Sequence, residues 1–298
     1  MVTAGGAKKE NGLLINGKII NDKILVHTAQ WYITHTCNIS CNHCLSYNNY
    51  NIKGHDNFKE NLIYAKEWAK KIIIKDFTIV GGEVFTHNNL NQWVFGLREI
   101  FPDIENFKVL TNGTVLSKYA DSFDKWFEKN IIIEISFKRE EDYNDLYEIL
   151  KRYKNVERKI HFMYDEAIYI NGKLCFLVEY CDSHMQWGIK EYKEGFYEFY
   201  NSNSEEAHKS CWQKDCHYFY KGNLYKCGTI VGAQEFVKNF PVKEHIKSRI
   251  NGYAPLKYDH PDLLEQIKSL NNHIPQCSLC PSIALDDKLV VDNKKILP

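Results

Sequence analysis

Apolar residues in the first half of the chain follow two alternating spacings. Short segments rich in apolar residues, typical of strands, occupy residues 31–33, 77–80, 107–110, 131–136 and 159–163. Between these runs, apolar residues recur at every third or fourth position, in residues 58–72, 90–100, 117–127 and 143–153. Strands that alternate with helices predict a parallel sheet covered by helices, and therefore an α/β fold.

Turn-forming residues predict three hairpins. Asn-Gly pairs between apolar flanks indicate hairpins over residues 13–20 and 169–174, and a Lys-Gly-Asn turn indicates a third over residues 218–225. Residues 174–179 can be the second arm of the middle hairpin or a sixth parallel strand, and the pattern leaves both open.

Helix boundary signals are fewer. Asp56 is a plausible N-cap for the first helix, and Pro102 stops the second. A further helix is predicted near residues 191–200, and Pro261 opens a last one.

The length of 298 residues suits one large domain, or one domain with a small additional domain. A hydrophobic content of 44% allows a substantial core. The regular alternation ends before residue 200. We therefore predict an N-terminal lead with a hairpin, an α/β domain and a cysteine-rich domain, over residues 1–28, 29–200 and 201–298.

Charge and targeting signals exclude several classes of protein. Lys+Arg and Asp+Glu both number 38, so the net charge is zero, which argues against nucleic acid or an anionic membrane as a partner. The sequence contains no run of about 18 apolar residues, so it predicts no transmembrane helix. Residues 1–10 lack the apolar core of a signal peptide. We expect a cytoplasmic protein.

Ten cysteines in a chain without an export signal indicate metal ligation in a reducing compartment. Eight of them fall into three groups, at residues 37–44, 211–227 and 277–280. Cys175 and Cys181 stand apart and are expected in or near the core.

The first group, Cys37, Cys41 and Cys44, has the spacing C-x3-C-x2-C and follows the strand of residues 31–33. Three thiolates on a [4Fe–4S] cluster would leave one iron open for a ligand. Alternatives are small buried hydrophobes, or zinc with His35 or His43 as fourth ligand. The motif resembles that of radical S-adenosylmethionine (radical SAM) enzymes, with His43 where the family usually has an aromatic residue.

That resemblance implies a partial (β/α)6 TIM-like barrel and a second set of site residues. In a parallel sheet, ligands sit beyond the carboxyl ends of the strands, where Gly81-Gly82-Glu83, Asn112 and Ser136 fall. By resemblance, the Gly-Gly-Glu backbone holds the methionine amino group, Ser136 contacts ribose or carboxylate, and Lys138 pairs with the carboxylate. A turn at the glycines and plain loop structure at the other positions are the alternatives.

The later cysteines resemble the SPASM and twitch extensions of the same family. Cys211, ten residues, Gly222, four residues and Cys227 match their pattern, and Cys277 and Cys280 add two thiolates. We expect one auxiliary [4Fe–4S] cluster, as in the shorter twitch form. Cys216 is a fifth candidate that could replace Cys211 or be free. A four-cysteine zinc knuckle is the alternative.

The resemblance implies an enzyme that reductively cleaves S-adenosylmethionine to a 5′-deoxyadenosyl radical, with an electron donor such as flavodoxin or ferredoxin. We expect hydrogen abstraction from a small polyol, sugar or aminocyclitol, giving oxidation or epimerisation. A peptide maturase is the alternative. Because only 36 residues precede Cys37, too few for a leader-binding domain, the small molecule is preferred. A non-catalytic zinc scaffold is a third possibility. The sequence does not identify the catalytic acid, base or hydrogen donor.

Overall fold

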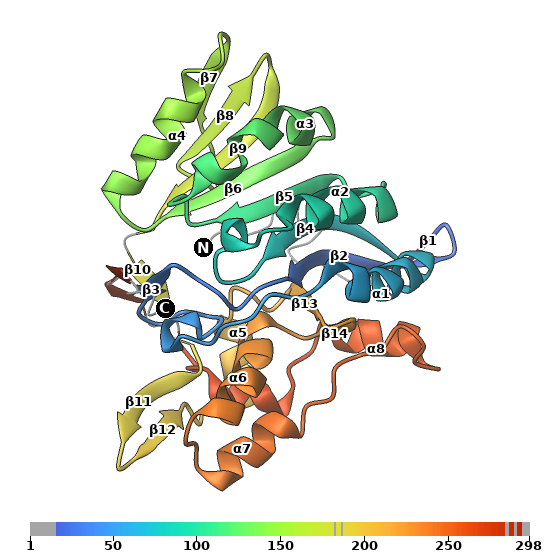
Figure 1. Cartoon of the computed structure of the whole chain (residues 1–298). Coiled ribbons are helices and arrows are strands. Elements are labelled where there is room, and N and C mark those ends of the chain that lie inside the picture. Colours follow the sequence, from blue (N-terminus) through green and yellow to red (C-terminus); the bar gives the residue numbers. More distant parts are fainter. Residues whose placement is uncertain (1–15, 182, 186, 284–285, 289–290, 294–298) are drawn as a thin grey trace.

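A ten-stranded sheet organises the computed structural model, which describes residues 16–181, 183–185, 187–283, 286–288 and 291–293. The strand order is β14-β13-β2-β4-β5-β6-β9-β8-β7, with β1 paired to β2 (Figure 1). The bounds are β1 Ile19–Ile20, β2 Lys23–Tyr32, β4 Ile72–Val80, β5 Asn106–Thr111, β6 Ile131–Phe137, β7 Val156–Ile160, β8 Glu166–Ile170, β9 Lys173–Tyr180, β13 Cys216–Tyr220 and β14 Asn223–Tyr225.

Six neighbouring strands of this sheet, β13, β2, β4, β5, β6 and β9, run parallel. Three helices connect β2, β4, β5 and β6 along the chain, namely α1 Phe58–Lys71, α2 Leu90–Ile100 and α3 Phe123–Glu128, and α4 Tyr143–Leu150 leads from β6 to β7. The fold class predicted from the sequence, an α/β partial barrel of the TIM-like type, is therefore confirmed.

One apolar core joins these helices to alternate residues of the strands. Trp68 of α1 and Trp93 of α2 are fully buried in it, together with Trp31 of β2 and Phe77 of β4. Because successive side chains of a strand point to opposite faces, Tyr32, Lys108 and Glu134 point to the inner face of the sheet. Asn57, and not Asp56, caps α1, since its side chain accepts a hydrogen bond from the amide of Lys59.

The predicted strand at residues 159–163 is wrong in position and in direction. The chain instead forms β7, which pairs antiparallel with β8 at the edge of the sheet. The fifth parallel strand along the chain is β9, which is at once the second arm of the hairpin with β8 and the parallel neighbour of β6. Both interpretations of residues 174–179 were therefore correct together.

Two other predictions need correction. The hairpin predicted over residues 13–20 with a turn at Asn16-Gly17 is misplaced, because β1 pairs with β2 across the turn Asn21-Asp22 in the left-handed region (φ 48° and 61°); residues 13–15 lie outside the described part of the chain. Residues 191–200 are not a helix, because β11 (Ile189–Lys193) and β12 (Phe196–Phe199) form a hairpin.

The C-terminal third lies beside β2 in Figure 1, on the side away from β7 to β9. It contains the confirmed hairpin β13–β14 and the helices α5 Ser204–Ser210, α6 Gly228–Asn239, α7 Glu244–Asn251 and α8 Leu263–Ser269. The division at residue 200 stays a prediction. The short strands β3 (Ile39–Cys41) and β10 (Ser183–Met185) pair with β16 (Val291–Asn293) and β15 (Asp286–Lys288). No described helix is long and apolar enough to cross a membrane.

Candidate functional site

The carboxyl ends of the parallel strands bring the predicted site residues to one edge of the sheet. The first cysteine group follows β2, Gly81-Gly82-Glu83 follows β4, and Asn112 follows β5. Ser136 lies at the end of β6, directly opposite Glu179 of β9 in the strand register. Parallel strands with right-handed crossovers place these ends together, so the convergence predicted from the sequence is present.

Gly81 and Gly82 pack directly on the loop that carries the cysteines. The amide of Gly82 donates to the carbonyl of Thr34 at 2.7 Å, and the amide of Glu83 donates to that of Thr36 at 2.8 Å. A Cβ on Gly82 would lie 2.4 Å from the Thr36 oxygen, and one on Gly81 would lie 2.5 Å from the Thr34 oxygen. Only glycine permits this approach. The two glycines therefore fix the position of the cysteine loop.

Glu83 points its carboxylate into the protein. Its side chain is fully buried and accepts hydrogen bonds from the Phe85 amide, the Thr111 hydroxyl and the Asn112 amide at 2.7–2.9 Å. Burial raises the pKa of this carboxyl to about 7, and the three donors oppose that rise. The side chain thus ties the end of β4 to the end of β5.

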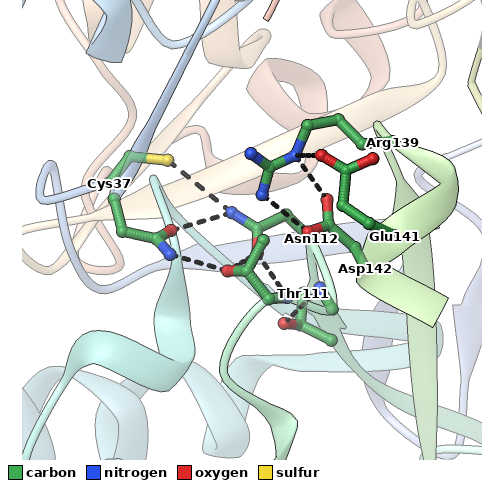
Figure 2. Close-up of polar contacts among 9 residues, drawn as sticks. Cys37, Thr111, Asn112, Arg139, Glu141 and Asp142 are labelled. Atoms are coloured by element: carbon green, nitrogen blue, oxygen red, sulfur yellow. Dashed lines mark hydrogen bonds and ion pairs between the residues drawn. The ribbon is translucent and has the colours of Figure 1, made fainter. Parts of the chain in front are cut away.

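Asn112 joins the β5 loop to the first cysteine group (Figure 2). Its side-chain amide donates to Asn38 Oδ1 at 3.0 Å and lies 4.0 Å from the Cys37 sulfur. Asn38 in turn donates to the Thr114 hydroxyl at 2.6 Å. A side-chain amide can donate to a nearby sulfur, so Asn112 links the end of β5 to Cys37, and its role at a cofactor stays a prediction.

The other two cysteines of this group lie on either side of a tight turn. Cys41 is buried in β3, whereas Cys37 and Cys44 are half-buried. His43 adopts a left-handed backbone (φ 51°) and lines a pocket between the cysteine loop and the β11–β12 hairpin. Three thiols on one loop at the carboxyl ends of the strands fit an iron–sulfur cluster with one open iron.

Ser136 and Lys138 are brought together with two further polar groups. The Lys138 ammonium donates to the Ser136 hydroxyl at 2.7 Å, and that hydroxyl lies 3.3 Å from Glu179 Oε2 and 3.0 Å from the Cys181 sulfur. Cys181 was predicted to lie in or near the core, and it is only half-buried at the end of β9.

Arg139 was missed by the sequence reasoning. It follows Lys138 and pairs with Asp142, Nη2 to Oδ1, at 2.6 Å, with Glu141 at 3.5 Å (Figure 2). The hydrogen bond to Asp142 is the main cause of a raised pKa of Arg139. The sequence signal for Arg139 was its position next to Lys138, as a second positively charged residue shortly after the fourth predicted strand.

Cys211, Cys227, Cys277 and Cys280 line a single cavity. Burial, together with a smaller contribution from neighbouring thiols of the group, raises the pKa of the Cys211 thiol to about 12 and that of Cys227 to about 11. Four thiols around one cavity fit an iron–sulfur cluster, whose assembly must displace their protons. Among the described residues, no three His, Cys, Asp or Glu side chains converge tightly enough to hold a single metal ion.

Cys216 is not among the residues that line this cavity. It begins β13, is 6% exposed and faces the inside of the sheet near Lys108 and Glu134. The geometry therefore favours Cys211 over Cys216 as the fourth thiol.

Lys226 also lines the cavity and is 2% exposed. Its ammonium donates to the carbonyls of Lys214 (3.0 Å) and Leu270.

Comparison with known proteins gives the following matches. The Radical SAM superfamily profile matches residues 31–165. A GTP 3′,8-cyclase of Petrotoga mobilis (strain DSM 10674 / SJ95) is 32% identical over 90 residues, 30% of this chain and 28% of that protein. The antilisterial bacteriocin subtilosin biosynthesis protein AlbA of Bacillus subtilis (strain 168) is 29% identical over 111 residues, 36% of this chain and 23% of that protein. The chain thus spans about a quarter of the length of these relatives.

Among solved structures, the crystal structure of BtrN in complex with AdoMet and 2-DOIA aligns with a TM-score of 0.43 and 16% identity. The alignment covers 87% of this chain and 94% of that chain.

Proposed function

Residues 31–165 belong to the radical SAM superfamily, and from that premise we propose that the protein is an enzyme that abstracts a hydrogen atom from a small hydroxylated substrate. The observation that carries this proposal is the cysteine loop held on Gly81 and Gly82, with Asn112 beside Cys37. When bound, the cluster and S-adenosylmethionine would supply reductive cleavage and a 5′-deoxyadenosyl radical.

The residues of the chain would bind and orient these groups. Cys37, Cys41 and Cys44 would hold the cluster, and the Gly81-Gly82-Glu83 backbone would lie along the cofactor. Lys138, which donates to the Ser136 hydroxyl, would pair with its carboxylate, and Arg139 would offer a second cation. The buried strands around the site would keep water from the reacting carbon.

Polar groups on the inner face of the sheet support a small hydroxylated substrate, such as a polyol, sugar or aminocyclitol. Ser136 and Glu179 lie near the carboxyl ends of β6 and β9, and the buried Lys108–Glu134 pair (3.2 Å) lies earlier along β5 and β6. Hydroxyl groups of a substrate can hydrogen-bond to such side chains, whereas an apolar substrate would leave them unsatisfied. Oxidation or epimerisation of an alcohol carbon is the proposed outcome.

A second candidate substrate is a peptide. The similarity of 111 residues to a bacteriocin biosynthesis protein favours it. An anaerobic screen that includes both polyols and peptides, with 5′-deoxyadenosine release above the substrate-free rate as the readout, separates the two. Stimulation by peptides alone would contradict the preferred substrate class.

We also propose that Cys211, Cys227, Cys277 and Cys280 hold a second cluster, supported by their common cavity. An electron donor such as flavodoxin or ferredoxin would reduce the enzyme.

The main test changes Cys37, Cys41 and Cys44 together to Ala. The variant should lose about four of about eight irons per chain and all formation of 5′-deoxyadenosine under dithionite. Iron, sulfide and zinc analysis of anaerobically purified protein is the matching measurement. Zinc without sulfide in the unchanged protein would contradict the proposal, as would cofactor cleavage by the triple variant.

A further inference from the structure

Tyr47 extends from the loop of the first cysteine group toward the second. Its amide donates to the carbonyl of Cys44 at 3.0 Å, and its side chain is 1% exposed. Its backbone is left-handed (φ 56°), a conformation that disfavours a bulky residue and must be held by its surroundings.

Two glycines make room for this side chain. A Cβ on Gly188 would lie 1.8 Å from the Tyr47 hydroxyl oxygen, and one on Gly232 would lie 2.4 Å from the ring. The ring also packs against Phe199 and Phe236, with centroid separations of 6.2 and 5.5 Å. The positions of both the ring and the hydroxyl of Tyr47 are therefore fixed by packing.

The hydroxyl group of Tyr47 has no hydrogen-bond partner among the described residues. Leaving a buried hydroxyl without an acceptor is unfavourable, so an acceptor is expected at this position. Leu279, which precedes Cys280, belongs to the same buried cluster as Tyr47. Trp187, which precedes the Gly188 that faces the hydroxyl, lines the cavity of the second thiol group. The hydroxyl thus lies beside the second group, while its own loop carries a thiol of the first.

We infer that the Tyr47 hydroxyl donates a hydrogen bond to a sulfur of the second cluster. This inference rests on the second cluster proposed above. A hydrogen bond to a cluster sulfur stabilises the reduced, more negative state and raises the reduction potential. Tyr47 is then a positioning residue that makes the potential of the second cluster depend on the loop that carries the first.

The test compares Tyr47→Phe with Tyr50→Phe in the full, reconstituted chain. Tyr50 is the matched control because it lies in the same loop and also packs on Phe236, with centroids 4.9 Å apart. Each variant keeps its ring and loses only a hydroxyl. The measurements are iron content and a redox titration followed by electron paramagnetic resonance, with the second cluster identified as the signal that S-adenosylmethionine does not alter.

Tyr47→Phe should shift the midpoint potential of the second cluster to a lower value at unchanged iron content, whereas Tyr50→Phe should not. Iron loss confined to Tyr47→Phe, with unchanged thermal unfolding of the apo-protein, would support the same contact. An unshifted potential, equal shifts in both variants, or iron loss with altered apo-protein unfolding overturns the inference. About four irons in the unchanged protein would instead overturn the second cluster itself.

Discussion

Gly81 and Gly82 show how far single residues could be interpreted from the sequence. Their place beside the site was predicted, because they follow a strand of a parallel sheet. The reason for glycine was assigned to the approach of the cofactor. The structure supplies a nearer cause, the backbone of residues 34–36, and no local sequence pattern indicates which loop packs on a given turn.

Gly82→Ala should therefore displace the first cysteine loop, since its Cβ would meet the Thr36 oxygen at 2.4 Å. We expect loss of up to about four irons and of 5′-deoxyadenosine formation, measured after anaerobic reconstitution. Gly252→Ala is the control, because the nearest atom there is the Ser248 oxygen at 3.1 Å. If the variant instead keeps its full iron content and binds S-adenosylmethionine more weakly, the need for glycine at this position comes from the approach of the cofactor and not from the cysteine loop.

Glu83 predicts a pH dependence. Its pKa is raised from 4.5 to about 7 in the folded protein, so the folded state binds its proton more tightly than the unfolded state. The contribution of this carboxyl to stability is present below pH 4.5 and is lost as the pH rises to about 7, by about 3 kcal/mol.

Glu83→Gln should remove that dependence. Thermal unfolding of both proteins, compared from pH 4.5 to 8, should show the difference in stability between them changing across this range and levelling off above about pH 7. A constant difference would mean that the three donors to Glu83 outweigh burial and keep it ionised throughout.

Among the elements, those defined by local pattern were predicted and those defined by pairing were not. The helices α1, α2 and α8 follow from apolar spacing and a nearby Pro or cap. The direction of β7 does not follow from local pattern, because it is set by pairing with β8. Residues 191–200 carry aromatic residues whose spacing suits either a helix or a hairpin, and pairing between β11 and β12 decides for the hairpin. The sequence likewise left open whether Cys216 replaces Cys211, since only β13 shows that Cys216 faces the inside of the sheet.

Cys211→Ala and Cys216→Ala test that separation. Because Cys211 lines the common cavity and Cys216 does not, the first change should remove up to about four irons and the second should leave the iron content intact. Circular dichroism shows whether each variant remains folded, since binding and folding are coupled at metal sites. The opposite result would assign the fourth thiol to Cys216.

At the scale of the whole molecule, β13 joins the sheet at a place that the sequence did not predict. It pairs in parallel with β2, from Cys216 opposite Thr28 to Phe219 opposite Trp31, so the two partners are about 188 residues apart in the chain. Contacts of such separation form slowly, because a long loop must close first. During synthesis, β2 therefore leaves the ribosome long before its neighbour exists. One edge of β2 then has unpaired amides and carbonyls, and an exposed edge of this kind invites association between nascent chains. The growing polypeptide would need either a chaperone or rapid translation through residue 220 to protect that edge.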